Sequence, residues 1–337
     1  MIREFSEHPL RELNSFQADE KARRLVSFDA ADDLDIIFAP ERRPEKWYVL
    51  GGGNNILFTR YFDGVLLKPD IHGISVLAED DDSVTVEAGA AVEWDDLVAW
   101  SVERGLWGAE NLSLIPGTVG AAPVQNIGAY GAEAKDVVAR VHWFDTERFR
   151  HGVLSAEECR FAYRDSIFKH ELRGRSVITS VELRFGKRSA PNLGYGDLQR
   201  ETAARGGATL DNIRAAVCAI RRGKLPDTAV SGNAGSFFKN PVVSRAEAES
   251  LVGRYGEMPI YPAADPECRK LAAGWLIDRA GMKGCRMGRV GVHDRQALVL
   301  VNFGGATGEE IMELAREVQR RVLDAFGIVI EPEVNIL

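Results

Sequence analysis

A serine in the C-terminal part of the chain stands in a setting suited to proton transfer. Ser236 follows a glycine and precedes two phenylalanines, so its hydroxyl could lie at the edge of an apolar pocket. Lys239 comes next and could place a cation nearby. The spacing is not G-x-S-x-G, and His293 is the only histidine after residue 170, which argues against a hydrolase triad. Taken alone, such a serine is more often a turn residue.

Two glycine-rich segments are candidates for ligand binding. Residues 51–55, Gly-Gly-Gly-Asn-Asn, follow a short predicted strand, and glycine lets backbone N–H groups approach a phosphate closely. A Rossmann fingerprint would need a glycine where Ile56 stands. Residues 115–131 hold four glycines and two prolines without becoming polar, which favours backbone lying flat against a planar ligand. The alternatives are a tight turn for the first segment and a loop buried between domains for the second.

Two further charged residues are weak candidates by themselves. Arg164 lies in Phe-Ala-Tyr-Arg-Asp-Ser and could form a surface pair with Asp165. Glu333 lies four residues before the C-terminal Leu337, where a glutamate is normally solvated.

Composition restricts the class of protein. The 337 residues carry a formal charge of −8, with no run of five Lys or Arg, which argues against a protein that binds nucleic acid. Hydrophobic residues make up 45%, as in an ordinary globular protein of about two domains. The four cysteines form no C-x-x-C pair, and the sequence shows no pattern of metal ligands. The first residues lack the apolar core of a signal peptide, and we expect a cytoplasmic protein.

Hydrophobic periodicity predicts the elements that must position these residues. An α/β region is followed near residue 200 by a region dominated by helical periods, with a loop or linker at 187–207. The clearest helix has Ile311, Val318 and Phe326 on one face, a capping box at Thr307 and Glu310, and Gly327 after it. The other predicted elements are helices within 29–38, 93–104 and 210–223, a helical stripe from 271 ending near 281, strands at 47–50, 84–86, 137–144 and 177–185, and an extended tail from 328.

Seven segments occur in the order found in a known family of flavoenzymes, and together they resemble UDP-N-acetylenolpyruvoylglucosamine reductases. Two of the seven are the most specific. Residues 115–131 hold Pro-Gly-Thr-Val-Gly at 116–120 and Gln-Asn-Ile-Gly-Ala-Tyr-Gly at 125–131, and residues 232–241 hold Gly-Ser-Phe-Phe-Lys-Asn-Pro at 235–241. The other matches are 14–16, 51–57, 163–166, 273–278 and 331–334. Residues 194–198, Gly-Tyr-Gly-Asp-Leu, are similar to the substrate-capping loop of the longer, tyrosine-containing subtype.

The resemblance implies an α+β fold with a two-part FAD-binding region of the vanillyl-alcohol-oxidase type and a separate α+β substrate-binding domain. The implied ranges are 1–70 for the first FAD-binding subdomain, 71–200 for the second and 201–327 for the substrate domain. The tail, 328–337, is expected to return to the active site. The implied cofactors are FAD and NADPH, the implied substrate is a UDP-sugar, and we expect a monomer with no metal and no membrane partner.

The resemblance also assigns roles to residues. Ser236, Glu333 and Arg164 match the catalytic residues, and Tyr163, Arg164, Tyr195, Lys224 and Asn240 match residues that bind the substrate. The residues expected to bind FAD are Gly51, Gly52, Gly53, Asn54, Asn55, Ile115, Pro116, Gly117, Thr118, Gly120, Ala121, Gln125, Asn126, Ile127, Gly128, Ala129, Tyr130 and Gly131.

The implied reaction is the reduction of an enolpyruvyl group on a UDP-sugar, which yields UDP-N-acetylmuramate for peptidoglycan synthesis. Hydride would add to the terminal carbon of the double bond, Arg164 would stabilise the charge that develops on the conjugated carboxylate, and Ser236 would protonate the adjacent carbon. Glu333 would act either as a protonated acid in a desolvated pocket or through water.

One departure from the family pattern and two competing functions are relevant. Relatives usually continue Glu-Val-Arg at the tail, whereas Asn335 stands here and the chain ends two residues later. The first competing function is an FAD oxidase of the same superfamily, which would react rapidly with oxygen and not respond to NADPH. The second is a non-catalytic flavin- or nucleotide-binding module, which would tolerate loss of Ser236, Arg164 and Glu333.

Overall fold

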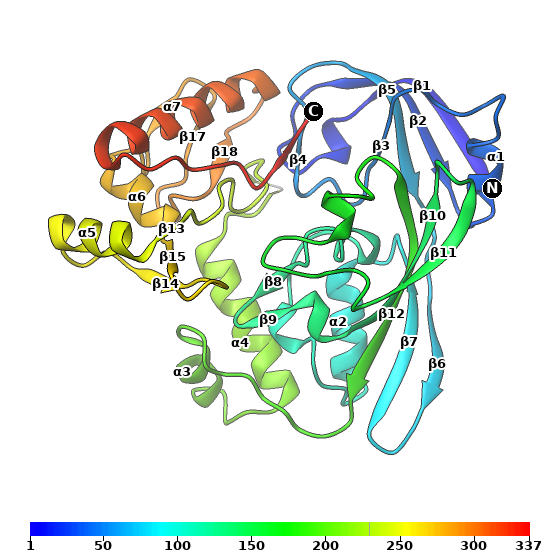
Figure 1. Cartoon of the computed structure of the whole chain (residues 1–337), viewed down its shortest axis with the longest axis horizontal. Coiled ribbons are helices and arrows are strands. Elements are labelled where there is room, and N and C mark those ends of the chain that lie inside the picture. Colours follow the sequence, from blue (N-terminus) through cyan, green and yellow to red (C-terminus); the bar gives the residue numbers. More distant parts are fainter. Residues whose placement is uncertain (229) are drawn as a thin grey trace. The chain divides into compact units, whose positions relative to one another are not determined.

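The computed structural model describes residues 1–228 and 230–337, which divide into two compact units (Figure 1). The first unit comprises Met1–His8, Ala22–Gly52 and Asp63–Gly223. The second comprises Pro9–Lys21, Gly53–Phe62 and Lys224–Leu337. Each unit is therefore built from segments that are distant in the sequence.

A four-stranded sheet forms one part of the first unit, with strand order β1-β2-β5-β3. Its strands are β1 (Ile2–Pro9), β2 (Lys21–Phe28), β3 (Trp47–Val49) and β5 (Phe62–Pro69). The short helix α1 (Asp33–Ile37) buries Leu34 and Ile37 in a core with Phe28 and Val65. Because β3 ends at Val49, the glycine-rich residues 51–55 follow it almost directly.

A five-stranded antiparallel sheet forms the other part of the first unit, with order β11-β10-β12-β7-β6. Its strands are β6 (Ile74–Glu79), β7 (Ser83–Gly89), β10 (Val138–Asp145), β11 (Arg150–Ser155) and β12 (Ser176–Gly186). Helix α2 (Trp94–Glu103) buries Trp94, Leu97 and Val98 in a core that also holds Val86 and Val181. Phe144 of β10 packs instead with Phe38, at 5.8 Å between ring centroids, and so joins the cores of the two sheets.

Two helices and a small hairpin complete the first unit. Helices α3 (Leu198–Ala203) and α4 (Leu210–Lys224) share a small core of Leu198, Ile213 and Val217. The hairpin consists of β8 (Gly128–Ala129) and β9 (Ala132–Glu133), which lie at the end of the glycine-rich segment 115–131.

In the part of the chain that the structure describes, the second unit holds three small sheets and three α-helices. The sheets have the orders β13-β15-β14, β16-β17-β18 and β19-β4. Their strands are β4 (Ile56–Leu57), β13 (Val242–Ser244), β14 (Ile260–Pro262), β15 (Cys268–Leu271), β16 (Arg286–Met287), β17 (Val290–Val292), β18 (Leu300–Asn302) and β19 (Asn335–Ile336), and the helices are α5 (Arg245–Tyr255), α6 (Ala273–Arg279) and α7 (Gly308–Phe326). Their shared core includes Phe237, Phe238, Leu276, Ile311 and Val318.

The helix predicted most clearly from the sequence is confirmed as α7. Its capping box is present, since Thr307 Oγ1 accepts a hydrogen bond from the Glu310 N–H and the Glu310 carboxylate accepts one from the Thr307 N–H. Gly327 ends the helix with φ of 72°, in the left-handed region that glycine adopts without strain. Ile311, Val318 and Phe326 are buried, as their spacing predicts.

Other predictions need correction at their edges. Helix α4 runs one residue past Gly223, and the predicted strand 84–86 is the centre of the longer β7. Several elements were not predicted, among them β1, β2, β5, β6, β11, α3 and α5. The sequence of β1 gave little signal because its residues are exposed on both faces, and period-two alternation arises only when one face is buried.

The predicted domain ranges divide the chain differently from the two compact units. The predicted substrate domain begins at residue 201, whereas α3 and nearly all of α4 lie in the first unit. The C-terminal residues 328–337 belong to the second unit. Which ligand each part of the chain binds stays a prediction.

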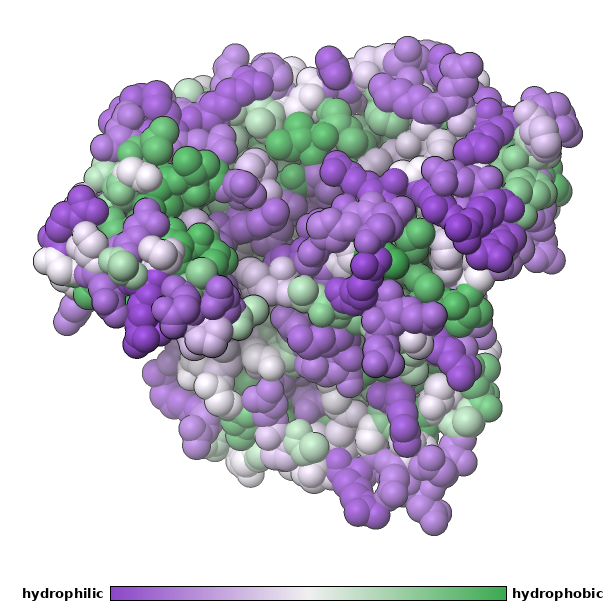
Figure 2. All heavy atoms as spheres, viewed as in Figure 1, coloured by the Kyte–Doolittle hydropathy of each residue, from purple (hydrophilic) through white to green (hydrophobic). Residues whose placement is uncertain are grey.

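Hydrophilic side chains cover much of the face shown in Figure 2, with smaller hydrophobic patches between them. Among the helices that the structure describes, none has both the length and the apolar character needed to cross a membrane.

We predict that the buried Asp145 stabilises the first unit in a pH-dependent way. Two hydrogen bonds from the Arg175 guanidinium, at 2.8 and 2.5 Å, lower the pKa of this carboxyl to about 2, below its ordinary value of 3.8. The stabilisation is therefore complete above about pH 4 and is lost as pH falls toward 2. Asp145→Asn should lower the free energy of unfolding by about 2 kcal/mol at pH 7. Urea unfolding followed by circular dichroism measures this.

The control is Asp82→Asn, which removes an exposed ion pair with Arg188 and should cost less than about 1 kcal/mol. An Asp145→Asn deficit that is as large at pH 2.5 as at pH 7 would contradict the assignment.

Candidate active site

The loop after β3 depends on glycine at two positions. A Cβ at Gly51 would lie 3.0 Å from Thr118 Oγ1 and 3.3 Å from Ala121 Cβ, so this glycine lets the loop approach the second glycine-rich segment closely. A Cβ at Gly53, whose φ is +69°, would lie 2.0 Å from the Leu13 carbonyl oxygen. The loop can therefore offer backbone groups, rather than side chains, to a ligand.

The first half of the segment 115–131 is held by backbone hydrogen bonds to the turn between β7 and α2. The Trp94 N–H donates to the Gly117 carbonyl at 2.8 Å, and the Gly120 N–H donates to the Ala90 carbonyl at 3.0 Å. A Cβ at Gly120 would lie 2.7 Å from Ala90 Cβ, so only glycine fits here. Small residues thus allow the segment to lie tightly on the sheet.

A partly buried cluster of charged residues holds the start of this segment. Leu114 has φ of +58°, and its N–H donates to Asp95 Oδ1 at 2.5 Å while its carbonyl accepts from Arg221 Nε at 3.1 Å. Arg214 makes two hydrogen bonds to Asp95, at 2.6 and 3.0 Å. Burial opposes ionisation of Asp95, but hydrogen bonds from Arg214 and Leu114 keep its pKa below the ordinary value.

The residues of this cluster were missed in the sequence. One signal was present, because Arg214 and Arg221 lie seven residues apart beside the apolar stripe of α4, on the side of the helix that faces the protein. Burial lowers the pKa of Arg221, which still carries its charge at neutral pH.

Asn126 ties the segment to the motif that carries Arg164. Its buried side-chain amide donates to Glu133 Oε2 at 2.9 Å and to the Ala162 carbonyl at 3.0 Å, and its Oδ1 accepts from the Lys135 N–H at 3.0 Å. The side chain that was predicted to bind FAD is therefore bonded to the chain itself. Ser166 adds a second tie, since its hydroxyl donates to the Val124 carbonyl at 2.6 Å.

These ties bring Arg164 to the end of the glycine-rich segment. The guanidinium donates to the Gly128 carbonyl at 3.0 Å, and a Cβ at residue 128 would lie 3.3 Å from the arginine Nη1. The Tyr163 ring lies 5.6 Å from the same guanidinium and is 40% exposed. The structure thus places two predicted substrate-binding residues beside predicted cofactor-binding residues.

Tyr195 also lies beside this segment. Its ring meets the Tyr130 ring edge to face, with centroids 6.0 Å apart, and it is 52% exposed. Burial raises the pKa of Tyr130 above the ordinary tyrosine value, so its hydroxyl stays protonated at neutral pH. Lys224, the last residue of α4, is exposed.

In the second unit, Ser236 directly precedes two buried phenylalanines on an extended segment, and this segment pairs with the tail. The side chain is exposed, whereas Phe237 and Phe238 are buried. Phe237 donates its N–H to the Leu298 carbonyl at 2.8 Å, and Ser236 itself pairs with Val299 in an antiparallel bridge. The two buried phenylalanines therefore anchor the segment, and the serine side chain lies at its exposed side.

Glu333 lies on the opposite edge of the same extended segment. Its N–H donates to the Phe237 carbonyl at 2.7 Å, and Lys239 donates its N–H to the Glu331 carbonyl at 2.9 Å. The antiparallel bridge between Phe238 and Pro332 completes this pairing. The tail thus brings Glu333 beside Phe237, the residue next to Ser236. Whether this is the active site stays a prediction.

The tail is also held on its other side. Strand β19 pairs in parallel with β4, and Asn335 donates both its N–H and its side-chain amide to the Asn55 carbonyl, at 3.1 and 3.0 Å. Thr59 donates its N–H and hydroxyl to the Leu337 carbonyl, each at 2.8 Å. Asn335 therefore helps to hold the tail through its main chain and its side chain.

Asn240 has a structural contact that the sequence did not indicate. Its Oδ1 accepts a hydrogen bond at 3.0 Å from the Ala273 N–H, at the first residue of α6. Such a bond satisfies a helix N–H that has no partner within the helix. Lys239 Nζ lies 3.8 Å from the carboxylate of Glu331.

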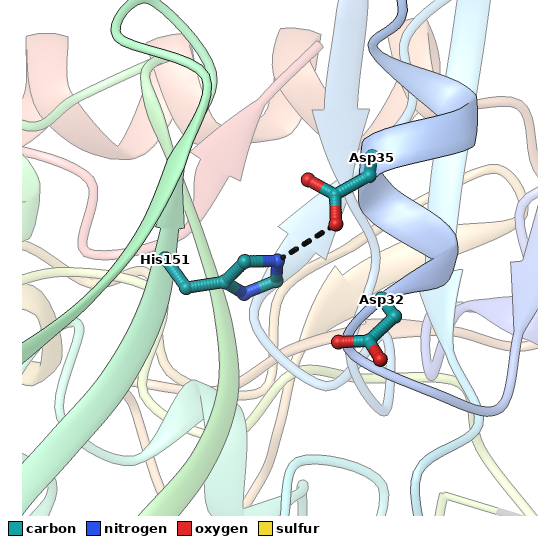
Figure 3. Close-up of side chains that lie close together, drawn as sticks. All are labelled: Asp32, Asp35 and His151. Carbon is teal, nitrogen blue, oxygen red and sulfur yellow. Dashed lines mark hydrogen bonds and ion pairs between the residues drawn. The ribbon is translucent and has the colours of Figure 1, made fainter.

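Apart from these residues, one group in the described part of the chain has a spacing suited to a metal ion. The ligand atoms of Asp32, Asp35 and His151 lie within 4.8 Å of one another (Figure 3). His151 contacts Asp35 at 3.3 Å, which accounts for the approach of the two side chains as an exposed pair.

Comparison with protein families gives two matches. A family model described as UDP-N-acetylenolpyruvoylglucosamine reductase, C-terminal domain, matches residues 226–337. A model described as FAD binding domain matches residues 29–147.

Proteins named UDP-N-acetylenolpyruvoylglucosamine reductase are similar over nearly the whole chain. The protein from Chromobacterium violaceum is 50% identical over 334 residues, covering 97% of both chains. The protein from Burkholderia orbicola is 49% identical over 332 residues, covering 97% of this chain and 95% of its own. The crystal structure of UDP-N-acetylenolpyruvylglucosamine reductase from Thermus caldophilus covers 100% of this chain and 98% of its own, with a TM-score of 0.70 and 23% identity, and shows the same fold.

We predict that the pairing of β19 with β4 holds Glu333 in place. Removing residues 335–337 deletes that pairing, each lost hydrogen bond being worth about 1 kcal/mol. The Glu333 and Lys239 amides should then exchange hydrogen at least about tenfold faster, as nuclear magnetic resonance or mass spectrometry can measure. Asn335→Ala is the control, because its main-chain N–H still bonds Asn55, and its exchange should change less. Unchanged protection of Glu333 in the shortened chain would contradict this role.

Proposed function

The chain belongs to the UDP-N-acetylenolpyruvoylglucosamine reductase family, and from that membership we propose how its residues carry out the family's reaction. The enzyme uses FAD and NADPH to reduce the enolpyruvyl group of UDP-N-acetylglucosamine-enolpyruvate, which gives UDP-N-acetylmuramate for peptidoglycan synthesis. The fold is α+β, with a two-part FAD-binding region of the vanillyl-alcohol-oxidase type and a separate C-terminal domain.

We assign FAD binding to residues 51–55 and to the segment 115–131. Both contain a glycine whose replacement would clash, Gly53 with the Leu13 carbonyl and Gly120 with Ala90, so their backbone can approach a flat or phosphorylated group. FAD held by these residues would supply the hydride chemistry that links NADPH to the substrate. The side chain of Asn126 supports this cradle, since its hydrogen bonds run to the chain.

Arg164 is the residue we assign to the substrate carboxylate. Hydride addition to the terminal carbon of the enolpyruvyl double bond moves negative charge onto the conjugated carboxylate, so the transition state resembles an enolate. A guanidinium fixed by its contact with Gly128 offers planar N–H donors without reorganisation.

Ser236 is the residue we assign to protonation of the carbon next to the carboxylate. The observation that supports this is its position, exposed at the edge of a buried aromatic pair and next to the tail segment that carries Glu333. A hydroxyl is a weak acid, so it can protonate this carbon only because the carbon gains strongly basic, carbanion-like character. The serine would then take back a proton from solvent or from a neighbouring group such as Lys239.

Glu333 is the second acid that we assign to the reaction. An ionised carboxylate would repel the developing enolate, whereas a protonated one would donate a hydrogen bond to it. Its main-chain hydrogen bond to Phe237 keeps it beside the serine segment in either state.

We assign Tyr163, Tyr195, Lys224 and Asn240 to the remainder of the sugar nucleotide. The exposed rings of Tyr163 and Tyr195 and the exposed ammonium of Lys224 suit a polar, anionic ligand. Asn240 would contact the ligand through its amide nitrogen, because its oxygen caps α6. The exposed Tyr195 also supports membership of the longer, tyrosine-loop subtype.

A monomeric enzyme in the cytoplasm completes the proposal. NADPH and UDP-sugars are metabolites of that compartment, which supports the location. The alternative of an FAD oxidase would require the reduced enzyme to react rapidly with oxygen, a rate that stopped-flow absorbance measures directly.

We predict that Ser236→Ala separates the two half-reactions. Loss of a proton donor should slow flavin reoxidation by the enolpyruvyl substrate by about a thousandfold. Flavin reduction by NADPH should stay within about twofold of the wild-type rate, because it requires no proton from this hydroxyl. Stopped-flow absorbance at the flavin band follows both. Ser244→Ala is the control, since this serine caps α5 and should affect only stability. Equal loss in both half-reactions would remove Ser236 from its assigned role.

We predict a similar separation for Arg164→Ala. Removing a preorganised donor to the enolate costs about 3 to 4 kcal/mol in the transition state, or about 10² to 10³ in the reoxidation rate. The control is Arg160→Ala, which removes an exposed arginine paired with Glu171 and should leave both rates unchanged. A variant in which substrate affinity falls but the rate at saturation does not would show that Arg164 binds the ground state and the transition state equally, which would contradict its assigned role.

A further inference from the structure

Arg164 stands at a position of its turn that disfavours residues with a Cβ. Residues 162–165 form a tight turn closed by two main-chain hydrogen bonds. The Ala162 N–H donates to the Asp165 carbonyl at 3.0 Å, and the Asp165 N–H donates to the Ala162 carbonyl at 3.2 Å. Within the turn Arg164 has φ of +55°, in the left-handed region that glycine or asparagine usually occupies. Contacts from outside the turn must therefore enforce this conformation.

Lys169 supplies such a contact. It is the last residue of a short 3₁₀ helix (Ile167–Lys169), and its ammonium donates to the Arg164 carbonyl at 2.9 Å. A hydrogen bond from a charged donor is stronger than one between neutral groups. The bond fixes the direction of the Arg164 carbonyl, and it thereby restricts the backbone dihedral angles of the residue that carries the guanidinium.

The 3₁₀ helix that carries Lys169 is anchored by other contacts. The hydroxyl of Ser166, at its start, donates to the Val124 carbonyl at 2.6 Å and accepts from the Phe168 N–H at 3.2 Å. Ser166 and Phe168 are both buried. The position of this helix therefore does not depend on the lysine ammonium, so a change of that ammonium acts on the turn rather than on the helix.

We propose that Lys169 is a positioning residue that acts through Arg164 by holding its backbone in the left-handed conformation. The inference rests on the proposed function, in which the guanidinium stabilises the charge that develops on the substrate carboxylate. Without the lysine bond, part of the molecules would leave this conformation, and the rate would fall in proportion to the fraction that keeps it. Because NADPH is assigned no contact with Arg164, flavin reduction should not depend on Lys169.

The first test compares Lys169→Met and Lys169→Arg in the FAD-loaded enzyme by stopped-flow absorbance. Lys169→Met keeps the unbranched apolar stem and removes the donor, whereas Lys169→Arg keeps a cationic donor. Flavin reoxidation at saturating enolpyruvyl substrate should slow about tenfold in Lys169→Met and stay within about threefold of wild type in Lys169→Arg. Flavin reduction by NADPH should stay within about twofold of wild type in both.

A double-mutant cycle separates positioning from direct contact with the substrate. In an Arg164→Ala background, Lys169→Met should change the reoxidation rate by less than about twofold, because the residue that it positions is gone. A full loss in that background would show that the ammonium acts on the ligand itself and would overturn the proposal. Without any substrate, hydrogen exchange of the Asp165 amide, which bonds across the turn, should accelerate in Lys169→Met.

Lys187→Met is the matched control, because this lysine also donates its ammonium to a main-chain carbonyl of the first unit, that of Asp80, at 2.6 Å. It should leave the reoxidation rate and the exchange of the Asp165 amide unchanged. If Lys169→Met fails to fold, Lys169→Gln replaces it with the same expectations, since its amide nitrogen lies one bond closer to the backbone than the lysine nitrogen.

Two results would overturn the proposal. Unchanged or faster reoxidation would show that Arg164 acts from another conformation, and unchanged exchange of the Asp165 amide would show that Lys169 does not hold the turn. A wild-type enzyme that does not reduce the enolpyruvyl substrate would instead overturn the proposed function, while the exchange data would still test how the turn is held.

Discussion

The position of Glu333 depends on main-chain hydrogen bonds along both sides of the last seven residues. On one side the tail pairs with the segment that carries Ser236, and on the other it pairs with β4. Main-chain pairing does not require a particular side chain, so this pairing does not depend on which residue stands at position 335. Residues 335–337 supply the pairing with β4. Residues at opposite ends of the second unit's sequence are thereby placed side by side.

In the first unit, the corresponding constraint is the shape of the backbone around the glycine-rich segment. Four residues there that are not glycine have φ between 45° and 58°, namely Leu114, Asn126, Tyr130 and Arg164. Each such conformation costs about 1 to 3 kcal/mol and persists only where surrounding contacts enforce it. Side-chain hydrogen bonds do so here, from Asp95 at Leu114, from Asn111 at Tyr130 and from Lys169 at Arg164. Strain held in this way is typical of a backbone preformed for a ligand.

Features that depend on residues close together in the sequence could be predicted, and features that depend on distant residues could not. Helix α7 was predicted with its cap and its buried face because those signals lie within a few residues of one another. The resemblance to relatives identified the candidate site residues, but not what they contact. It did not show that Asn126 and Asn240 bond the chain itself. It also did not show that Asp95, Asn111 and Arg221 support the site, because their hydrogen-bond partners lie 19 to 107 residues away in the sequence. No local pattern reports such contacts.

The charged residues that hold the glycine-rich segment also affect the binding of charged ligands. Of the two partly buried arginines of α4, Arg214 is neutralised by Asp95, whereas the described residues give the Arg221 guanidinium only a carbonyl partner, that of Leu114. Its pKa is lowered by burial and further by the positive charge of Arg164. Two cations that repel each other beside the glycine-rich segment raise the electrostatic energy of the unliganded protein. A ligand that brings negative charge relieves that repulsion, and FAD, NADPH and the UDP-sugar are all anionic. The same arginine that fixes the strained start of the segment therefore also favours the charge of what the enzyme must bind.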